Sequence, residues 1–143
     1  MAISFHINCI PPKSTHQAAL RILRRRDGTQ FLGKCSSSKG KHVQNELLML
    51  FAPHAPPAPM QGALTLNVYW AYPWRKSEKK ANIAKGAMLC DTRPDCDNLA
   101  KFIMDILTRL GFYKDDGQVA SLNFTKSWSN APGITVTLDS AEE

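Results

Sequence analysis

Residues 98–111 read NLAKFIMDILTRLG, and this stretch predicts the principal helix of the molecule. Its apolar residues recur at intervals of three and four, which places them on one side of a helix. Asp97 is a suitable N-cap and Gly111 a typical C-terminal stop. The sequence therefore predicts a helix over residues 98–110 whose apolar face consists of Leu99, Phe102, Ile103, Ile106, Leu107 and Leu110.

Alternating patterns on both sides of this helix predict strands. Every second residue from Leu64 to Tyr72 is apolar, which is the strongest strand pattern in the chain, and Pro73 ends it. Residues 3–9 alternate in the same way, and two later strands are expected at 119–128 and 134–138, joined by a turn through 130–133. The predicted fold is α+β, a single two-layer domain in which a mixed or antiparallel sheet packs against helices.

Residues 14–59 are expected to form a variable region made of a hairpin, a loop and a helix. Asp27-Gly28 predicts the tight turn of a hairpin over residues 21–33, which places Arg24, Arg25 and Arg26 beside an exposed turn. Residues 34–41, rich in Ser, Lys and Gly, predict a loop, and residues 43–52 predict a helix that Pro53 stops. No internal repeat or long linker divides the chain, so residues 1–143 are expected to form one domain.

The length and composition are typical of a globular protein. A chain of 143 residues with 43% hydrophobic residues can bury a core without disulfides. No apolar run is long enough to cross a bilayer and the N-terminus does not resemble a signal peptide, so we expect a cytoplasmic protein without membrane association. The four cysteines match no common zinc-binding spacing, which disfavours a zinc site.

The charge is distributed very unevenly along the chain. Residues 1–90 contain 13 Lys and Arg against 3 Asp and Glu, whereas residues 91–116 contain 6 acidic and 4 basic residues. A basic protein with one local cluster of carboxylates is suited to bringing a polyanion to a bound cation. A basic surface that only faces solvent is the alternative, and charge alone does not decide between them.

The acidic cluster predicts a metal site. Pro94 favours an extended approach, in which Asp95 and Asp97 point to the same side. Oxygen ligands without neighbouring histidines favour Mg²⁺, with Mn²⁺ as a substitute. Lys101 lies one helical turn after Asp97 and can contact a phosphate. A strand returning beside the helix is expected to bring Asp116 to the two other carboxylates, with Asp115 as its nearest competitor.

Each of these residues also has an ordinary structural interpretation. Asp97 can serve only as an N-cap, and Asp115 and Asp116 can serve only in a turn. Lys101 and Asp105 can be an exposed pair of no functional importance. These interpretations do not explain why a protein with a net charge of +6 gathers half of its acidic residues in 26 positions. The cluster as a whole therefore favours metal-dependent chemistry.

The pattern of these segments resembles the RusA family of Holliday junction resolvases, which are often carried by prophages. The first matching segment is Pro94-Asp95-x-Asp97-Asn98-Leu99-x-Lys101, followed by Asp105-x-Leu107. The second is Asp115-Asp116-x-Gln118-Val119, with Lys126 after it. Residues 60–140 resemble the family well, and residues 14–59 only loosely.

The resemblance implies a homodimeric endonuclease that uses Mg²⁺ to make symmetrical nicks in a four-way DNA junction. It assigns essential carboxylates to Asp95, Asp97 and Asp116 and an active-site lysine to Lys101. The run of arginines that precedes the first aspartate in the family is weaker here. We therefore expect the phosphate contacts to come from Arg75, Lys76, Lys79, Lys80, Lys85 and Arg93.

Two features of the sequence have alternative interpretations. Trp74, beside the basic segment, is the aromatic residue best placed to contact DNA, whereas the alternation of Trp70 and Tyr72 favours a core position for both. The alternatives to a junction resolvase are a module that binds branched DNA without cutting it and a Mg²⁺-dependent nuclease of other branched DNA.

Overall fold

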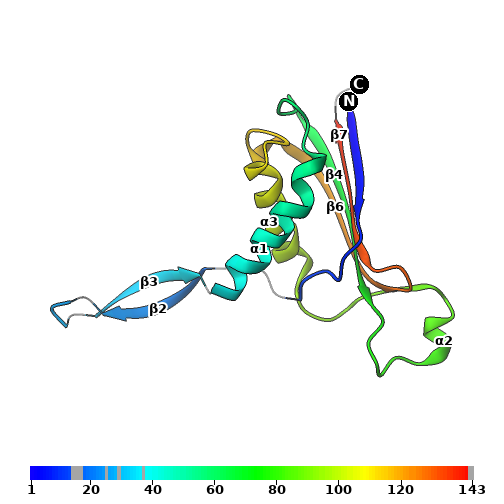
Figure 1. The fold of residues 1–143 in the computed structure, drawn as a ribbon, viewed down its shortest axis with the longest axis horizontal. Coiled ribbons are helices and arrows are strands. Elements are labelled where there is room, and N and C mark those ends of the chain that lie inside the picture. Colours follow the sequence, from blue (N-terminus) through cyan, green and yellow to red (C-terminus); the bar gives the residue numbers. More distant parts are fainter. Residues whose placement is uncertain (14–17, 25, 29, 37, 142–143) are drawn as a thin grey trace.

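The computed structural model describes residues 1–13, 18–24, 26–28, 30–36 and 38–141, and within these it contains a five-stranded mixed sheet and a separate two-stranded hairpin (Figure 1). The strand order in the sheet is β1-β7-β4-β6-β5. These strands span Ala2–Ile7 (β1), Leu64–Pro73 (β4), Ala87–Leu89 (β5), Val119–Ser129 (β6) and Gly133–Ser140 (β7). Strands β2 (Ala18–Arg24) and β3 (Gln30–Ser36) form the hairpin.

Pairing within the sheet is antiparallel except at its centre. Strand β7 runs antiparallel to β1 and β4, and β4 runs parallel to β6. The short β5 pairs with β6 only from Ala87 opposite Ser129 to Leu89 opposite Ser127. Residues 119–125 of β6 are therefore a free edge on the side away from β4, within the part of the chain that the structure describes.

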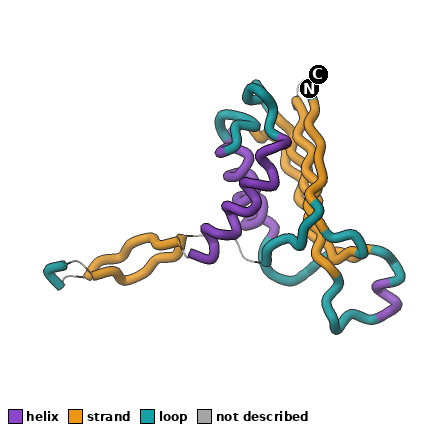
Figure 2. The backbone as a smooth tube through the Cα atoms, in the orientation of Figure 1, coloured by secondary structure: helices purple, strands orange, loops and turns teal. Residues whose placement is uncertain are grey.

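Helices cover one face of the sheet. Helix α1 spans Ser38–Phe51 and is followed by the 3₁₀ turn Ala52–His54, and helix α3 spans Cys96–Arg109 (Figure 2). The two helices are joined by Gln44, which donates a hydrogen bond to Asp105 at 2.6 Å and accepts one from Arg109 at 3.2 Å. Both predicted layers are present, so the α+β fold class is confirmed.

The predicted alternation of β4 is confirmed by burial. Leu64, Leu66, Val68 and Trp70 lie in the core under the helices, whereas Tyr69 on the opposite face is exposed. The apolar residues of α3 meet this layer, and Leu99, Ile103, Ile106 and Leu107 are completely buried. Burial of these apolar side chains is the main force that holds α3 on the sheet.

The boundaries of both helices differ from the predictions. Helix α3 begins at Cys96, so its N-cap is Asp95 and not Asp97. Its C-terminal end agrees, because Gly111 follows with a φ of +78°, a conformation that favours glycine. The predicted loop at 34–41 is wrong at both ends, because β3 continues to Ser36 and α1 already begins at Ser38. Its first turn is polar and contains Gly40, which hid it from a search for apolar periodicity.

The segment between β4 and α3 contains two short elements that the sequence did not predict. Helix α2 spans Lys80–Ile83, and β5 follows at Ala87–Leu89. Both are too short to show a recognisable period. In the ribbon, this segment extends beyond the lower end of the sheet, while the β2–β3 hairpin projects away from the body (Figure 1). No helix in the described ranges is long and apolar enough to span a membrane.

Candidate active site at the N-terminal end of helix α3

Asp95 and Asp97 both lie at the N-terminal end of α3. Asp95 is the N-cap, with an extended backbone (φ −73°, ψ 147°) and no capping hydrogen bond from its side chain, and Asp97 lies in the first helical turn. Both residues are exposed. The expectation that they alternate along an extended strand is wrong, because the helix starts between them. The positive end of the helix dipole favours negative charge at this position, and both exposed carboxylates are accessible to a cation.

A buried lysine fixes the segment that leads into Asp95. The ammonium group of Lys126, on β6, donates to the carbonyl oxygens of Thr92 and Pro94, the latter at 2.7 Å. Lys126 is only 8% exposed, and no carboxylate of a described residue forms an ion pair with it. The backbone of Cys90 also donates to the carbonyl of Lys126 at 2.9 Å. These contacts attach the Asp95 segment firmly to the sheet.

This role of Lys126 predicts the effect of Lys126→Met, which keeps most of the side-chain volume. Two backbone carbonyls lose their buried donor, so we expect the free energy of unfolding in urea to fall by about 1–3 kcal/mol. The nuclease activity that the resemblance implies should fall by about 10–100-fold, as is typical when a group that orients site residues is lost. The exposed Lys114→Met is the matched control. Full nuclease activity in Lys126→Met would show that Lys126 has no role in orienting Asp95.

Lys101 is exposed one turn after Asp97 and forms no ion pair with a described carboxylate. The alternative pairing of Lys101 with Asp105 is not observed. Asp105 instead accepts from Gln44 and lies 3.6 Å from the guanidinium Nε of Arg109. Lys101 therefore retains a free positive charge near Asp97, where it can contact a phosphate.

Asp115 and Asp116 lie at the other end of α3, in a tight capping arrangement. The Asp115 carboxylate accepts from the Gly117 N–H at 2.9 Å, and the Gln118 side chain accepts from the Asp115 N–H at 3.2 Å. The pKa of Asp115 is lowered mainly by the hydrogen bond from Gly117. A side-chain hydrogen bond with Asp116 lowers it further. Asp115 therefore caps the 3₁₀ turn Asp116–Gln118, whereas the exposed Asp116 carboxylate contacts Asp115 but accepts no capping hydrogen bond.

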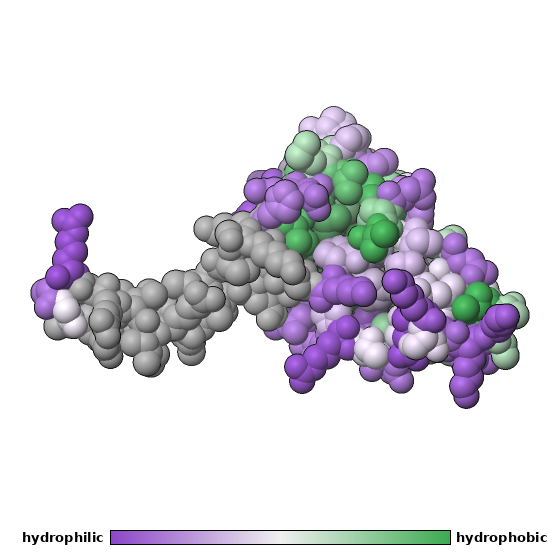
Figure 3. Space-filling view, turned by 60° about the horizontal axis from the view of Figure 1, so that its bottom comes forward, coloured by the Kyte–Doolittle hydropathy of each residue, from purple (hydrophilic) through white to green (hydrophobic). Residues whose placement is uncertain are grey.

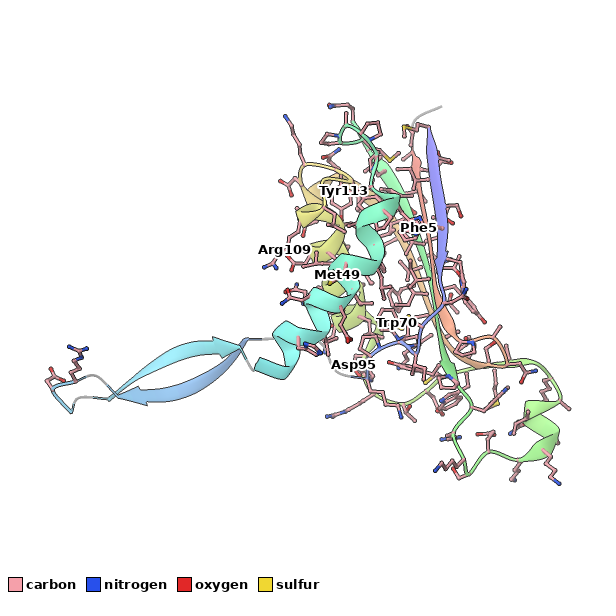
Figure 4. The ribbon with its side chains drawn as sticks, viewed as in Figure 1. Phe5, Met49, Trp70, Asp95, Arg109 and Tyr113 are labelled. Carbon is pink, nitrogen blue, oxygen red and sulfur yellow. The ribbon has the colours of Figure 1, made fainter. Side chains whose placement is uncertain are left out.

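The two groups of carboxylates are far apart within one chain. The 14 residues of α3 separate them, and these span about 20 Å at 1.5 Å per residue. Figure 4 shows Asp95 near the lower end of α3 and Tyr113, which precedes Asp116 by three residues, near the upper end. Within the described ranges no three His, Cys, Asp or Glu side chains are grouped to hold a metal. The expectation that Asp116 meets Asp95 and Asp97 within one chain is therefore wrong.

The basic residues expected to contact DNA lie in the segment between β4 and α3. This segment is at the Asp95 end of the molecule, and Figure 3, which turns that end forward, shows a mostly hydrophilic surface there. Among these basic residues only Arg75 forms an ion pair with a described residue, namely Glu78 at 2.7 Å. The full set is Arg75, Lys76, Lys79, Lys80, Lys85 and Arg93.

The aromatic residues at the end of β4 divide as the sequence indicated. Trp70 and Tyr72 are buried in the core, and burial raises the pKa of Tyr72 to about 12. Trp74 is only partly buried. Its ring is held by a hydrogen bond from Nε1 to the side-chain oxygen of Asn130 at 2.7 Å. Trp74 is therefore the ring of this group that a ligand can reach.

Comparison with known proteins identifies the class to which this fold and site belong. Residues 8–139 match the family described as Endodeoxyribonuclease RusA. The match includes the sheet except β1 and the last residue of β7, together with both groups of carboxylates. The chain therefore belongs to the RusA family and is an endodeoxyribonuclease.

A bacterial relative supports this assignment. The chain is 31% identical over 106 residues to the uncharacterized protein YqaN of Bacillus subtilis (strain 168). The aligned region covers 71% of this chain and 74% of that protein. The similarity therefore extends over most of both chains.

Proposed function

We propose that this protein is a Mg²⁺-dependent endonuclease that resolves four-way DNA junctions by symmetrical nicks in two opposed strands. The observation that carries the proposal is the exposed pair Asp95 and Asp97 at the N-terminal end of α3, in a chain of the RusA family. Because the family is one of endodeoxyribonucleases, a module that binds DNA without cutting it is disfavoured. With DNA as its substrate, the protein would act in the cytoplasm.

The residues at this end of α3 fit a Mg²⁺ ion, with Mn²⁺ as a substitute. Mg²⁺ is commonly held by one or two carboxylates, water and substrate phosphate, and Asp95 and Asp97 supply the two carboxylates. A bound Mg²⁺ would activate water and neutralise charge on the scissile phosphate. The ammonium group of Lys101 would pair with a phosphate oxygen and hold the strand against the two carboxylates. Hydrolysis would break the bond from phosphorus to the 3′-oxygen, leaving a 3′-hydroxyl and a 5′-phosphate.

Asp116 enters this site only if a second copy of the chain contributes it. A two-fold homodimer can place the far end of one α3 beside the near end of the other, provided that the two helices run antiparallel. We therefore propose that each metal site combines Asp95 and Asp97 of one protomer with Asp116 of the partner subunit. The family motif contains all three residues, and this arrangement reconciles the motif with their separation in one chain.

The free edge of β6 supports such a dimer. Residues 119–125 have no strand partner on one side within the described ranges, and Leu122, at their centre, is 45% exposed. An unprotected edge of this length readily pairs with another chain. Antiparallel pairing of two β6 edges about Leu122 would put Val119 of one copy opposite Thr125 of the other. Asp116, just before Val119, would then approach the partner's Lys126 and the Asp95 segment that this lysine holds.

The basic segment would provide the DNA-binding surface. Arg75, Lys76, Lys79, Lys80 and Lys85 lie on the segment that extends from the Asp95 end of the molecule, and Arg93 precedes Asp95 by two residues. Such residues neutralise phosphates without reading the sequence, so binding should weaken steeply as salt increases. A two-fold dimer would present two of these surfaces to a junction that is itself close to two-fold symmetric.

The test is electrophoresis of the products from a four-way junction, a three-way junction and a linear duplex, each with Mg²⁺ or with EDTA. We expect paired nicks in opposed strands of the four-way junction, only with Mg²⁺, and little cutting of the duplex. Equal cutting of the duplex, or cutting in EDTA, would contradict the proposal. Preference for the three-way junction would instead favour a nuclease of other branched DNA.

A further inference from the structure

A cavity of about 600 Å³ lies between the end of β4 and the segment before α3. Its volume is in the range of pockets that hold small ligands. No acidic residue lines it, and four basic residues do: Lys13, Arg75, Lys76 and Arg93. In the sequence, only Pro94 lies between the lining residue Arg93 and Asp95.

The charges around this cavity are mostly uncompensated. Arg75 is engaged already, because it pairs with Glu78 at 2.7 Å and stacks 4.2 Å above the ring of Trp128. No described carboxylate lies within ion-pair distance of Lys13, Lys76 or Arg93. Three free positive charges around one cavity favour an anionic ligand, and phosphate is the anion that a DNA substrate supplies.

An aromatic ring lies beside these charges. Three aromatic residues line the cavity, namely Tyr72, Trp74 and Trp128. Tyr72 and Trp128 are buried, and the Tyr72 hydroxyl donates to the carbonyl of Pro12 at 2.9 Å. Trp74 is partly exposed and its orientation is fixed by Asn130. A fixed, accessible indole beside free cations is the combination that binds a nucleotide by stacking on its base and pairing with its phosphate.

We propose that this cavity binds one unstacked nucleotide of the DNA substrate, next to the scissile phosphate. A base inside an intact duplex is already stacked on both faces, so only an extruded or unpaired nucleotide can stack on Trp74. The cavity shares the Thr92–Pro94 segment with the site, because Thr92 lines the cavity while its carbonyl is held by Lys126. Binding here would therefore set the position of the adjacent phosphate relative to Asp95. The inference depends on the proposed assignment of Asp95 to the active site.

The test is a scan of junction affinity with single abasic nucleotides placed on either side of the crossover. Dissociation constants are measured in EDTA by fluorescence anisotropy for the wild-type protein, Trp74→Ala and Trp74→Phe. Trp74→Ala should weaken binding of the intact junction by about 5- to 150-fold, the range found for loss of one base–aromatic stack. At one position an abasic nucleotide should weaken the binding of the wild-type protein by a similar factor. The affinity of Trp74→Ala for that abasic junction should equal its affinity for the intact junction. Trp74→Phe keeps a ring but loses the hydrogen bond to Asn130, so its affinity should lie between those of Trp74→Ala and the wild type.

Two outcomes would overturn the inference. In the first, Trp74→Ala binds the intact junction as tightly as the wild type. In the second, an abasic nucleotide weakens the binding of Trp74→Ala by the same factor as that of the wild type at every position tested. Because binding is measured without metal, either result can occur while the wild-type protein still cuts junctions with Mg²⁺. That combination would remove the nucleotide pocket and leave the proposed function intact. Failure of the wild type to cut would instead count against the proposed function.

Discussion

Replacing Asp95 with Asn is expected to lower the rate of Mg²⁺-dependent junction nicking by roughly 10³-fold or more. Asparagine keeps the size of the side chain but removes the negative charge that would bind the cation. Asp95 makes no capping hydrogen bond, so stability should be almost unchanged. Affinity for the junction should stay equal or rise, because one charge that repels phosphate is lost. Single-turnover nicking and anisotropy measure the two quantities separately.

Asp91→Asn is the matched control for this variant. Asp91 is an exposed carboxylate four residues earlier in the same segment, and it lies outside α3. The control removes the same charge from the same end of the molecule, so it reports the effect of net charge alone. Equal nicking by Asp91→Asn and Asp95→Asn would contradict the assignment of Asp95 to the active site.

Asp116→Asn is expected to lower nicking by a comparable factor, although Asp116 lies about 20 Å from Asp95 along α3. The reason is that Asp116 would complete the metal site of the partner subunit. Asp115→Asn is the matched neighbour, because its remaining side-chain oxygen can still accept from Gly117. We expect Asp115→Asn to retain most of the activity, as measured by single-turnover nicking of the same junction. Loss of activity in Asp115→Asn but not in Asp116→Asn would reverse the assignment.

Local sequence patterns predicted the elements of this fold well where the apolar period was long. Helix α3 and strand β4 were found from their own residues, because each buries one complete face. Helix α2 and strand β5 were missed because four and three residues cannot show a period. The parallel pairing of β4 with β6 was also beyond prediction, since it joins segments more than 50 residues apart and leaves no local pattern.

The error about Asp116 has a simple geometric cause. A 14-residue helix carries the chain about 20 Å away from Asp95, and the residues that begin the return remain at the far end. The residue that comes back to the Asp95 segment is Lys126, seven residues along β6 from Val119. A strand advances about 3.3 Å per residue, so this return matches the length of the helix. Lys126 was visible in the family motif, but only the fold indicates what it holds.

The most direct test of the central proposal is to combine the two inactive variants in one dimer. Asp95→Asn and Asp116→Asn chains with different tags are co-expressed, and the mixed dimer is purified through both tags. A site shared between protomers predicts that one of the two sites in the mixed dimer is fully wild type. The mixed dimer should therefore nick one strand of a junction at about half of the wild-type rate, while each homodimer is inactive. A mixed dimer as inactive as both homodimers would contradict the shared site.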